Sequence, residues 1–256
     1  MTLGSKFLRV VLFTFCVGFS SIGHAQQPAT NAPPPATSNN VSAQPPVDPE
    51  AQALSDAFKL LIQEKPDDAL AKINPVIQAD PNNVNAFFMR GNIYVQKKLY
   101  DQAEKDYQIA DQLNKKTAAT GPMFNMDGAI KFNLAEIKFL EKKYDDAQAG
   151  FVALKSDSNW GDLATYKIFL CNLLGGHEDV AAKELDAFNQ VGSNPSYYFA
   201  NAAWALIHHK PEDARPWLKS IINIYSPQKI ALYSSSLKSL GYLPLPPPPA
   251  PAPSPN

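Results

Sequence analysis

The sequence has little cysteine: Cys16 and Cys171 are its two thiols. Cys16 lies in an apolar N-terminal stretch that we expect to be removed from the mature chain. The single remaining thiol cannot close an intramolecular disulfide, so we expect the fold to depend on core burial. The apolar surroundings of Cys171 in the sequence favour a buried, inert thiol over a reactive one.

The chain also lacks an excess of positive charge. Its formal net charge is −1, and loss of Lys6 and Arg9 with a leader would make it −3. Nucleic-acid binding depends on many Lys and Arg side chains that neutralise phosphates. We therefore expect no nucleic-acid partner.

No hydrophobic run reaches the length of a membrane span. Lys6 and Arg9 precede an apolar run over 10–19, which is followed by the small residues Gly23 and Ala25. This order is typical of a secretory signal peptide, here 1–25. A spanning helix needs about 20 apolar residues, so we expect an exported mature chain without an integral membrane segment. The periplasm is the favoured location, and secretion is the alternative.

Motifs for catalysis are also missing: there is no nucleophile elbow, phosphate-binding glycine loop or HExxH sequence. His177 falls at an expected turn. The adjacent His208 and His209 would point in different directions on a helix, unlike a metal pair at i and i+4. We predict a protein that is not an enzyme, with no catalytic residue, no metal and no cofactor.

Two segments are rich in proline, at 26–49 and 242–256. Neither contains enough large apolar residues to offset the chain entropy lost on folding. We expect both to be disordered, and the tail to favour polyproline II. They act either as spacers or as docking strands for an aromatic-lined groove.

A repeat runs through the middle of the chain. One or two acidic residues stand just ahead of an alanine at intervals of 34, 44, 34 and 33 residues, at Ala69, Ala103, Ala147, Ala181 and Ala214. The same intervals separate a ladder of large residues: Leu54, Phe88, Phe132, Tyr166 and Phe199. A period of 34 residues is typical of a helix-turn-helix repeat. The longer interval indicates an insertion, at 114–128, whose Met123, Phe124 and Met126 either pack on the core or suit adaptable binding.

The second unit carries the most complete pattern, with Gly91, Tyr94, Tyr100, Ala103 and Ala110 at set spacing. In this it resembles the tetratricopeptide repeat (TPR) family. The resemblance implies an all-α fold: a TPR-type right-handed α-solenoid of about five helix-turn-helix repeats over 50–224. Two repeats depart from the pattern, because Lys138 replaces a usual aromatic residue and Phe169 occupies a small-residue position. The fourth repeat therefore fits the family pattern in either of two alignments, which differ by one residue.

Small residues are expected where the two helices of a repeat cross. A glycine inside a helix costs about 1 kcal/mol relative to alanine, so Gly91 must gain from close packing against the second helix of its repeat. The end of such an array exposes an apolar face. We predict a capping helix over 225–241, with Ile230, Tyr233, Leu237 and Leu240 on its buried stripe and Ser235, Ser236, Lys229 and Lys238 lying elsewhere.

In TPR proteins the first helix of each repeat lines a concave groove, and the resemblance implies such a groove here. The candidate peptide-binding residues are Phe88, Asn92, Phe132, Asn133, Glu136, Tyr166, Lys167 and Phe199. Alternatively, these large residues pack against the adjacent repeat. The family's carboxylate clamp is not expected, because Phe88 and Leu163 stand where it needs cations.

Two functional hypotheses follow. The favoured one is a non-catalytic protein-protein interaction scaffold of the cell envelope that binds a peptide or helix in its groove. The alternative is a structural or self-associating envelope protein without a dedicated peptide ligand. Neither hypothesis identifies the partner.

Overall fold

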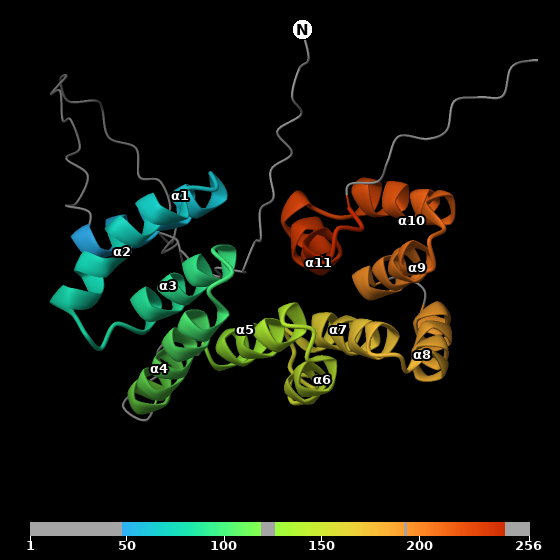
Figure 1. Cartoon of the computed structure of the whole chain (residues 1–256), viewed down its shortest axis with the longest axis horizontal. Coiled ribbons are helices and arrows are strands. Elements are labelled where there is room, and N and C mark those ends of the chain that lie inside the picture. The colour runs from blue at the N-terminus through green and yellow to red at the C-terminus, as the bar shows by residue number, and fades with distance from the viewer. Residues whose placement is uncertain (1–47, 119–125, 192–193, 244–256) are drawn as a thin grey trace, which may run out of the picture.

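The computed structural model describes residues 48–118, 126–191 and 194–243 (Figure 1). The expected signal peptide, the first proline-rich segment up to residue 47, the tail from 244, and Met123 and Phe124 lie outside these ranges. The described residues form eleven helices and no strand. These are α1 Pro49–Ile62, α2 Pro66–Ala79, α3 Val84–Gln96, α4 Tyr100–Ala118, α5 Asp127–Leu140, α6 Tyr144–Val152, α7 Gly161–Leu174, α8 Glu178–Val191, α9 Pro195–Ile207, α10 Pro211–Ile224 and α11 Pro227–Ser239.

Helices α1 to α10 form five pairs, each joined by a short turn, and the pairs follow one another along an arc. Figure 1 shows α1 and α2 at one end of the arc and α9 to α11 at the other, with α4, α6 and α8 on the outer side. The described helices are therefore a one-dimensional stack of pairs, followed by the single helix α11.

Within the described ranges, none of the helices is long and apolar enough to traverse a bilayer.

The turn inside each pair has one residue with a left-handed backbone. Glu64, Lys98, Lys142 and His209 have φ values of 59, 59, 63 and 57°, and Gly176 has 89°. The next amide in each turn donates to a carbonyl five residues earlier, as from Lys65 to Leu60 at 2.9 Å and from Lys210 to Ala205 at 2.8 Å. This is the Schellman arrangement that ends a helix. The five turns recur at the intervals of the alanine ladder, so Phe169 does stand at the small-residue position of the fourth repeat.

The alanine ladder is buried where the helices of a pair meet: Ala69, Ala103, Ala147, Ala181 and Ala214 are all inaccessible to solvent. Gly91 also allows the two helices of its repeat to pack closely. A Cβ atom placed on Gly91 would lie 2.5 Å from Cε1 of Tyr107, a ring on the second helix of the same repeat. The glycine thus admits this ring against α3, as the sequence predicts. Phe169 instead packs edge-on against Phe188 of α8, with ring centroids 5.8 Å apart.

The insertion between the second and third repeats begins as helix. α4 runs to Ala118, so the first residues of the expected loop at 114–128 extend α4. Asn114 is buried on this extension, and its Oδ1 accepts from the backbone amide of Met126, 3.3 Å away. That contact holds the start of α5 against the end of α4.

Candidate functional site

The final helix, α11, lies on the inner side of the arc (Figure 1). The ring of Tyr233 on α11 is 5.7 Å from that of Tyr166 on α7 and 5.3 Å from that of Phe199 on α9. The Tyr233 hydroxyl donates to Oδ2 of Asp162 in the first turn of α7. The ladder residues of the fourth and fifth repeats therefore face α11.

Lys167, on α7, contacts the C-terminal half of α11. Its ammonium donates to both carboxylate oxygens of Glu136 on α5, at 2.8 and 2.7 Å. Its third donor goes to Oγ of Ser236 on α11. All three Lys167 protons are thus used, as a buried ammonium requires. The rings of Phe132 and Phe139 lie 5.6 and 5.2 Å from the same nitrogen.

We call the residues of α5, α7 and α9 that contact Tyr233 and Ser236 the α11 seat: Glu136, Asp162, Tyr166, Lys167 and Phe199. Asp162 also joins the fourth repeat to the fifth. Its Oδ1 accepts from Asn194 at 2.7 Å, and its backbone carbonyl accepts from Ser196 at 2.9 Å. The seat is therefore a preassembled polar and aromatic surface, because its members are tied to neighbouring repeats as well as to α11.

Two tyrosines at the seat stay neutral. Burial raises the pKa of Tyr166 well above its ordinary value, and Tyr233 is raised by burial and by its hydrogen bond to Asp162. Among the described residues, the Tyr166 hydroxyl has no hydrogen-bond partner. A buried hydroxyl left unpaired costs about 1 to 3 kcal/mol. With α11 in place, the seat therefore still contains one buried polar group, the Tyr166 hydroxyl, without a hydrogen bond.

The polar side of α11 is buried, which differs from the sequence prediction. Ser234, Ser235 and Ser236 are all buried, although Ser235 and Ser236 were expected to lie away from the core. The reason is long-range: Ser236 meets Lys167, which is 69 residues away in the sequence. By contrast, Ile222 and Ile224 on α10 remain 68% and 52% exposed, so the outer end of the last repeat is left uncovered.

Three of the predicted groove residues belong to the core around the second repeat. The Tyr107 hydroxyl donates to Oδ1 of Asn92 at 2.6 Å, and Nδ2 of Asn133 donates to the same oxygen at 3.1 Å. The Phe88 and Tyr107 rings are 5.5 Å apart. These residues join α3, α4 and α5, and present no open surface.

All eight predicted peptide-binding residues are buried, which corrects the expectation of an open groove lined by their side chains. The structure brings five of them together around the middle of α7: Phe132, Glu136, Tyr166, Lys167 and Phe199. The other three, Phe88, Asn92 and Asn133, lie apart from these. The sequence analysis missed Asp162 and gave Ser236 no part in the site. An acid in the first turn of α7 was visible, but its partner on α11 was not.

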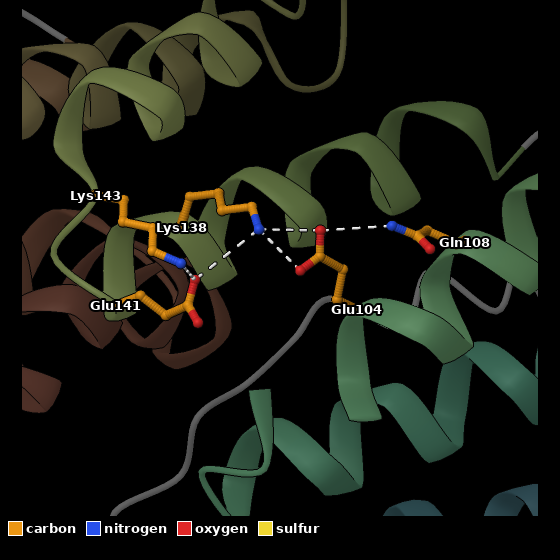
Figure 2. A network of polar contacts seen from close by, with 5 residues as sticks. All are labelled: Glu104, Gln108, Lys138, Glu141 and Lys143. Carbon is orange, nitrogen blue, oxygen red and sulfur yellow. Dashed lines mark hydrogen bonds and ion pairs between the residues drawn. The ribbon is translucent and has the colours of Figure 1, made fainter. Parts of the chain in front are cut away.

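Lys138, which replaces a usual aromatic residue, has a structural role. Figure 2 shows its ammonium between Glu104 of α4 and Glu141, the residue that directly follows α5. Its nitrogen lies 2.8 and 3.0 Å from the two Glu104 oxygens, and this hydrogen bonding raises the pKa of Lys138. The network links the second repeat to the third on the side of α4.

The described residues show no sign of a reactive centre at Cys171. The thiol is buried on α7, and burial raises its pKa to about 12. A thiol in this state is protonated and a poor nucleophile at neutral pH.

Within the described ranges, no three His, Cys, Asp or Glu side chains gather in a way that could hold a metal ion.

Comparison with known proteins gives partial matches. No family model matches the chain. It is 38% identical over 52 residues to DnaJ homolog subfamily C member 3 of Bos taurus and of Homo sapiens. That stretch is 20% of this chain but only 10% of each of those proteins.

Two solved structures are similar over most of the chain. One is PilW, a widely conserved type IV pilus biogenesis factor, with a TM-score of 0.51 and 17% identity over 76% of this chain and 87% of that one. The other is YrrB, a TPR protein with an unusual peptide-binding site, with a TM-score of 0.43 and 18% identity over 72% of this chain and 91% of that one.

The helix pairs, their repeated turns and the arc define this protein as an α-solenoid. More particularly, its fold is that of a tetratricopeptide repeat protein, as the PilW likeness and the 34-residue register agree.

Proposed function

We propose that this protein is a non-catalytic interaction scaffold of the cell envelope, and that the inner face of its repeat array binds a peptide or helix from a protein partner. The observation that carries the proposal is the position of α11, which places Tyr233 and Ser236 on side chains of three successive repeats. A surface that holds one helix through specific polar and aromatic contacts is suited to hold another. The envelope location rests on the leader-like sequence at 1–25.

Site-specific photo-crosslinking in cells tests this function. Asn85 is exposed on α3 and stands three residues before Phe88 of the ladder, so it shares the helix face that meets α11 in later repeats. Val152 is 55% exposed and belongs to α6, a helix on the outer side of the arc (Figure 1). A photoreactive residue at Asn85 should capture a defined envelope protein that the same residue at Val152 does not. Equal capture at both positions, or none at Asn85, would reject an inner-face scaffold.

A second candidate is self-association through the outer end of the array. Ile222 of α10 is the counterpart of Ile77 of α2 in the repeat register, and Ile77 packs against the core of the following repeat. Ile222 has no following repeat and is largely exposed. This candidate predicts a concentration-dependent oligomer in sedimentation experiments that Ile222→Asp abolishes. A strict monomer at high concentration would exclude it.

A further inference from the structure

We propose that α11 is a displaceable occupant of the inner face, and that the partner is a helix presenting the same groups to the α11 seat. Those groups are a tyrosine, a hydroxyl residue three positions later, and an apolar residue immediately after it. The inference rests on the proposed function and refines it by naming the partner's chemistry.

The spacing of these groups follows from the contacts of α11. Tyr233 donates to Asp162, and Ser236 accepts from Lys167. Leu237, next in the chain, is completely buried. Residues at i, i+3 and i+4 lie on one face of a helix, so a single helix face meets the whole seat. A purely apolar helix would leave Oδ2 of Asp162 and one Lys167 proton unpaired, which selects against such a helix.

The fit of α11 to its seat is incomplete. The Tyr166 hydroxyl has no partner. The hydroxyls of Ser234 and Ser235 return to carbonyls of their own helix, at 3.4 and 2.9 Å. Buried hydroxyls stabilise a contact less than apolar groups of similar size. A partner helix with an acceptor for Tyr166 and apolar residues in place of these serines would bind the seat more tightly than α11 does.

The attachment of α11 to the rest of the chain allows its release. α10 ends at Ile224 and α11 begins at Pro227, so only Tyr225 and Ser226 connect them. The exposed Ile222 and Ile224 show that α11 leaves part of the apolar surface of α10 uncovered. The hydrogen bonds and ring contacts of Tyr233 and Ser236 are made with the seat and with Ser196 of α9. None of them joins the two helices of one repeat, so α11 can leave without breaking the pairing inside the five repeats.

A labelled synthetic helix tests the proposal on the full-length chain. The probe is a fluorescent peptide of residues 226–243, and binding is measured by anisotropy. Tyr233→Ala in the protein weakens its own α11, so the probe should bind this variant at least tenfold more tightly than the wild type. Ser239→Ala, at an exposed position of the same helix, should bind the probe like the wild type. Equal affinity for the wild type and Tyr233→Ala would overturn the proposal.

The peptide itself provides the test of recognition chemistry. A probe with phenylalanine for Tyr233 and alanine for Ser236 should bind the Tyr233→Ala protein at least tenfold more weakly than the natural sequence. Binding of both probes with the same affinity would overturn the requirement for a hydroxyl pair. The substitutions are in the peptide, so this comparison does not alter the folded protein.

Hydrogen exchange on the unaltered protein gives an independent readout. With ¹⁵N-labelled protein and excess unlabelled peptide, we expect faster exchange in residues 227–239 and unchanged exchange in α9. Unchanged protection of α11 would overturn displacement. A dimer in which two copies of this chain exchange their α11 helices without added peptide would also overturn the proposal, because the helix on the seat would then come from a second copy and not from a partner protein. If the peptide displaces α11 but the photoreactive residue at Asn85 captures no protein, the helix-binding role of the seat stands and the proposed scaffold function is rejected.

Discussion

Lys167 and Glu136 form an ion pair in the interior, between α7 and α5, with the two carboxylate oxygens 2.7 and 2.8 Å from the ammonium. Lys167 is fully buried and Glu136 nearly so. The pair joins the third and fourth repeats, and Ser236 extends it to α11. Charges buried this deeply persist only when each satisfies the other.

The first prediction concerns this pair. Lys167→Met should lower the free energy of unfolding by about 3 to 5 kcal/mol, because Glu136 is left buried without its partner. Adding Glu136→Leu should recover most of the loss, since no unpaired charge then remains buried between α5 and α7. Urea unfolding followed by circular dichroism measures both effects. Lys115→Met, at an exposed pair with Asp111, is the control and should change stability by less than about 1 kcal/mol. A Lys167→Met protein as stable as the wild type would contradict the buried pair.

Gly91→Ala should destabilise the protein although alanine is the better helix former. The new methyl would meet Cε1 and Cδ1 of Tyr107 at 2.5 and 2.8 Å. Overpacking typically costs about 1 to 3 kcal/mol, against a gain of about 1 kcal/mol in helix propensity. Thermal unfolding of the single variants and the double variant with Tyr107→Leu measures the coupling. Strict additivity in this cycle would show that the ring is not what excludes a side chain at Gly91.

Glu64→Gly should stabilise the protein by about 0.5 to 1 kcal/mol, because Glu64 has φ of 59° and glycine adopts this backbone without a Cβ penalty. Gln63→Gly is the matched control. Gln63 is also exposed but has φ of −78°, so its replacement should destabilise by up to about 1 kcal/mol. Chemical denaturation distinguishes the two. The same sign of effect at both positions would argue against the left-handed turn.

His208 should titrate above its ordinary pKa. Its pKa is raised by the hydrogen bond to Glu178 and then by that to the Trp204 carbonyl. The ring nitrogens lie 2.8 Å from Glu178 Oε1 and 2.7 Å from that carbonyl. Both partners are acceptors, so both ring nitrogens donate only in the imidazolium. The resulting stabilisation is complete below about pH 6.5 and is lost as pH rises through the higher folded pKa.

Proton NMR titration tests the histidine prediction. Glu178→Gln should lower the pKa of His208, and it should flatten the pH dependence of unfolding that this pair contributes. Asp179→Asn removes a neighbouring exposed acid and should leave the titration of His208 unchanged. If the two variants lower the pKa of His208 equally, the summed charge of nearby acidic residues raises that pKa, and not the hydrogen bond to Glu178.

The helix pairs were predictable from the sequence because their signals are local or periodic. The alanine at Ala103 and its counterparts identified the crossings, and the 34-residue interval identified the register. Even the fourth repeat keeps that register, despite Phe169. What could not be predicted was the direction in which the large ladder residues face. Tyr166 suits either an open groove or a covered one, and only the position of α11 decides between them.

The burial of Ser236 was unpredictable for the same reason. A run of serines on an amphipathic helix usually faces solvent, and no local feature of α11 indicates otherwise. Its partners, Lys167 and Glu136, are 69 and 100 residues away. Contacts over such separations depend on the curvature of the whole array, which results from many small differences in helix packing. Of the eight residues predicted to bind a peptide, five lie together around the middle of α7 and three lie apart from these.

The most direct test of the inner face as a helix-binding surface is a distance measurement between α11 and the repeats. Spin labels at Ser239 on α11 and Val152 on α6, in full-length protein with Cys16→Ala and Cys171→Ala, report the position of α11 by pulsed electron resonance. We predict a narrow distance distribution in the free protein and a second, longer one when the peptide of residues 226–243 is added. A distribution unchanged at saturating peptide would contradict the account.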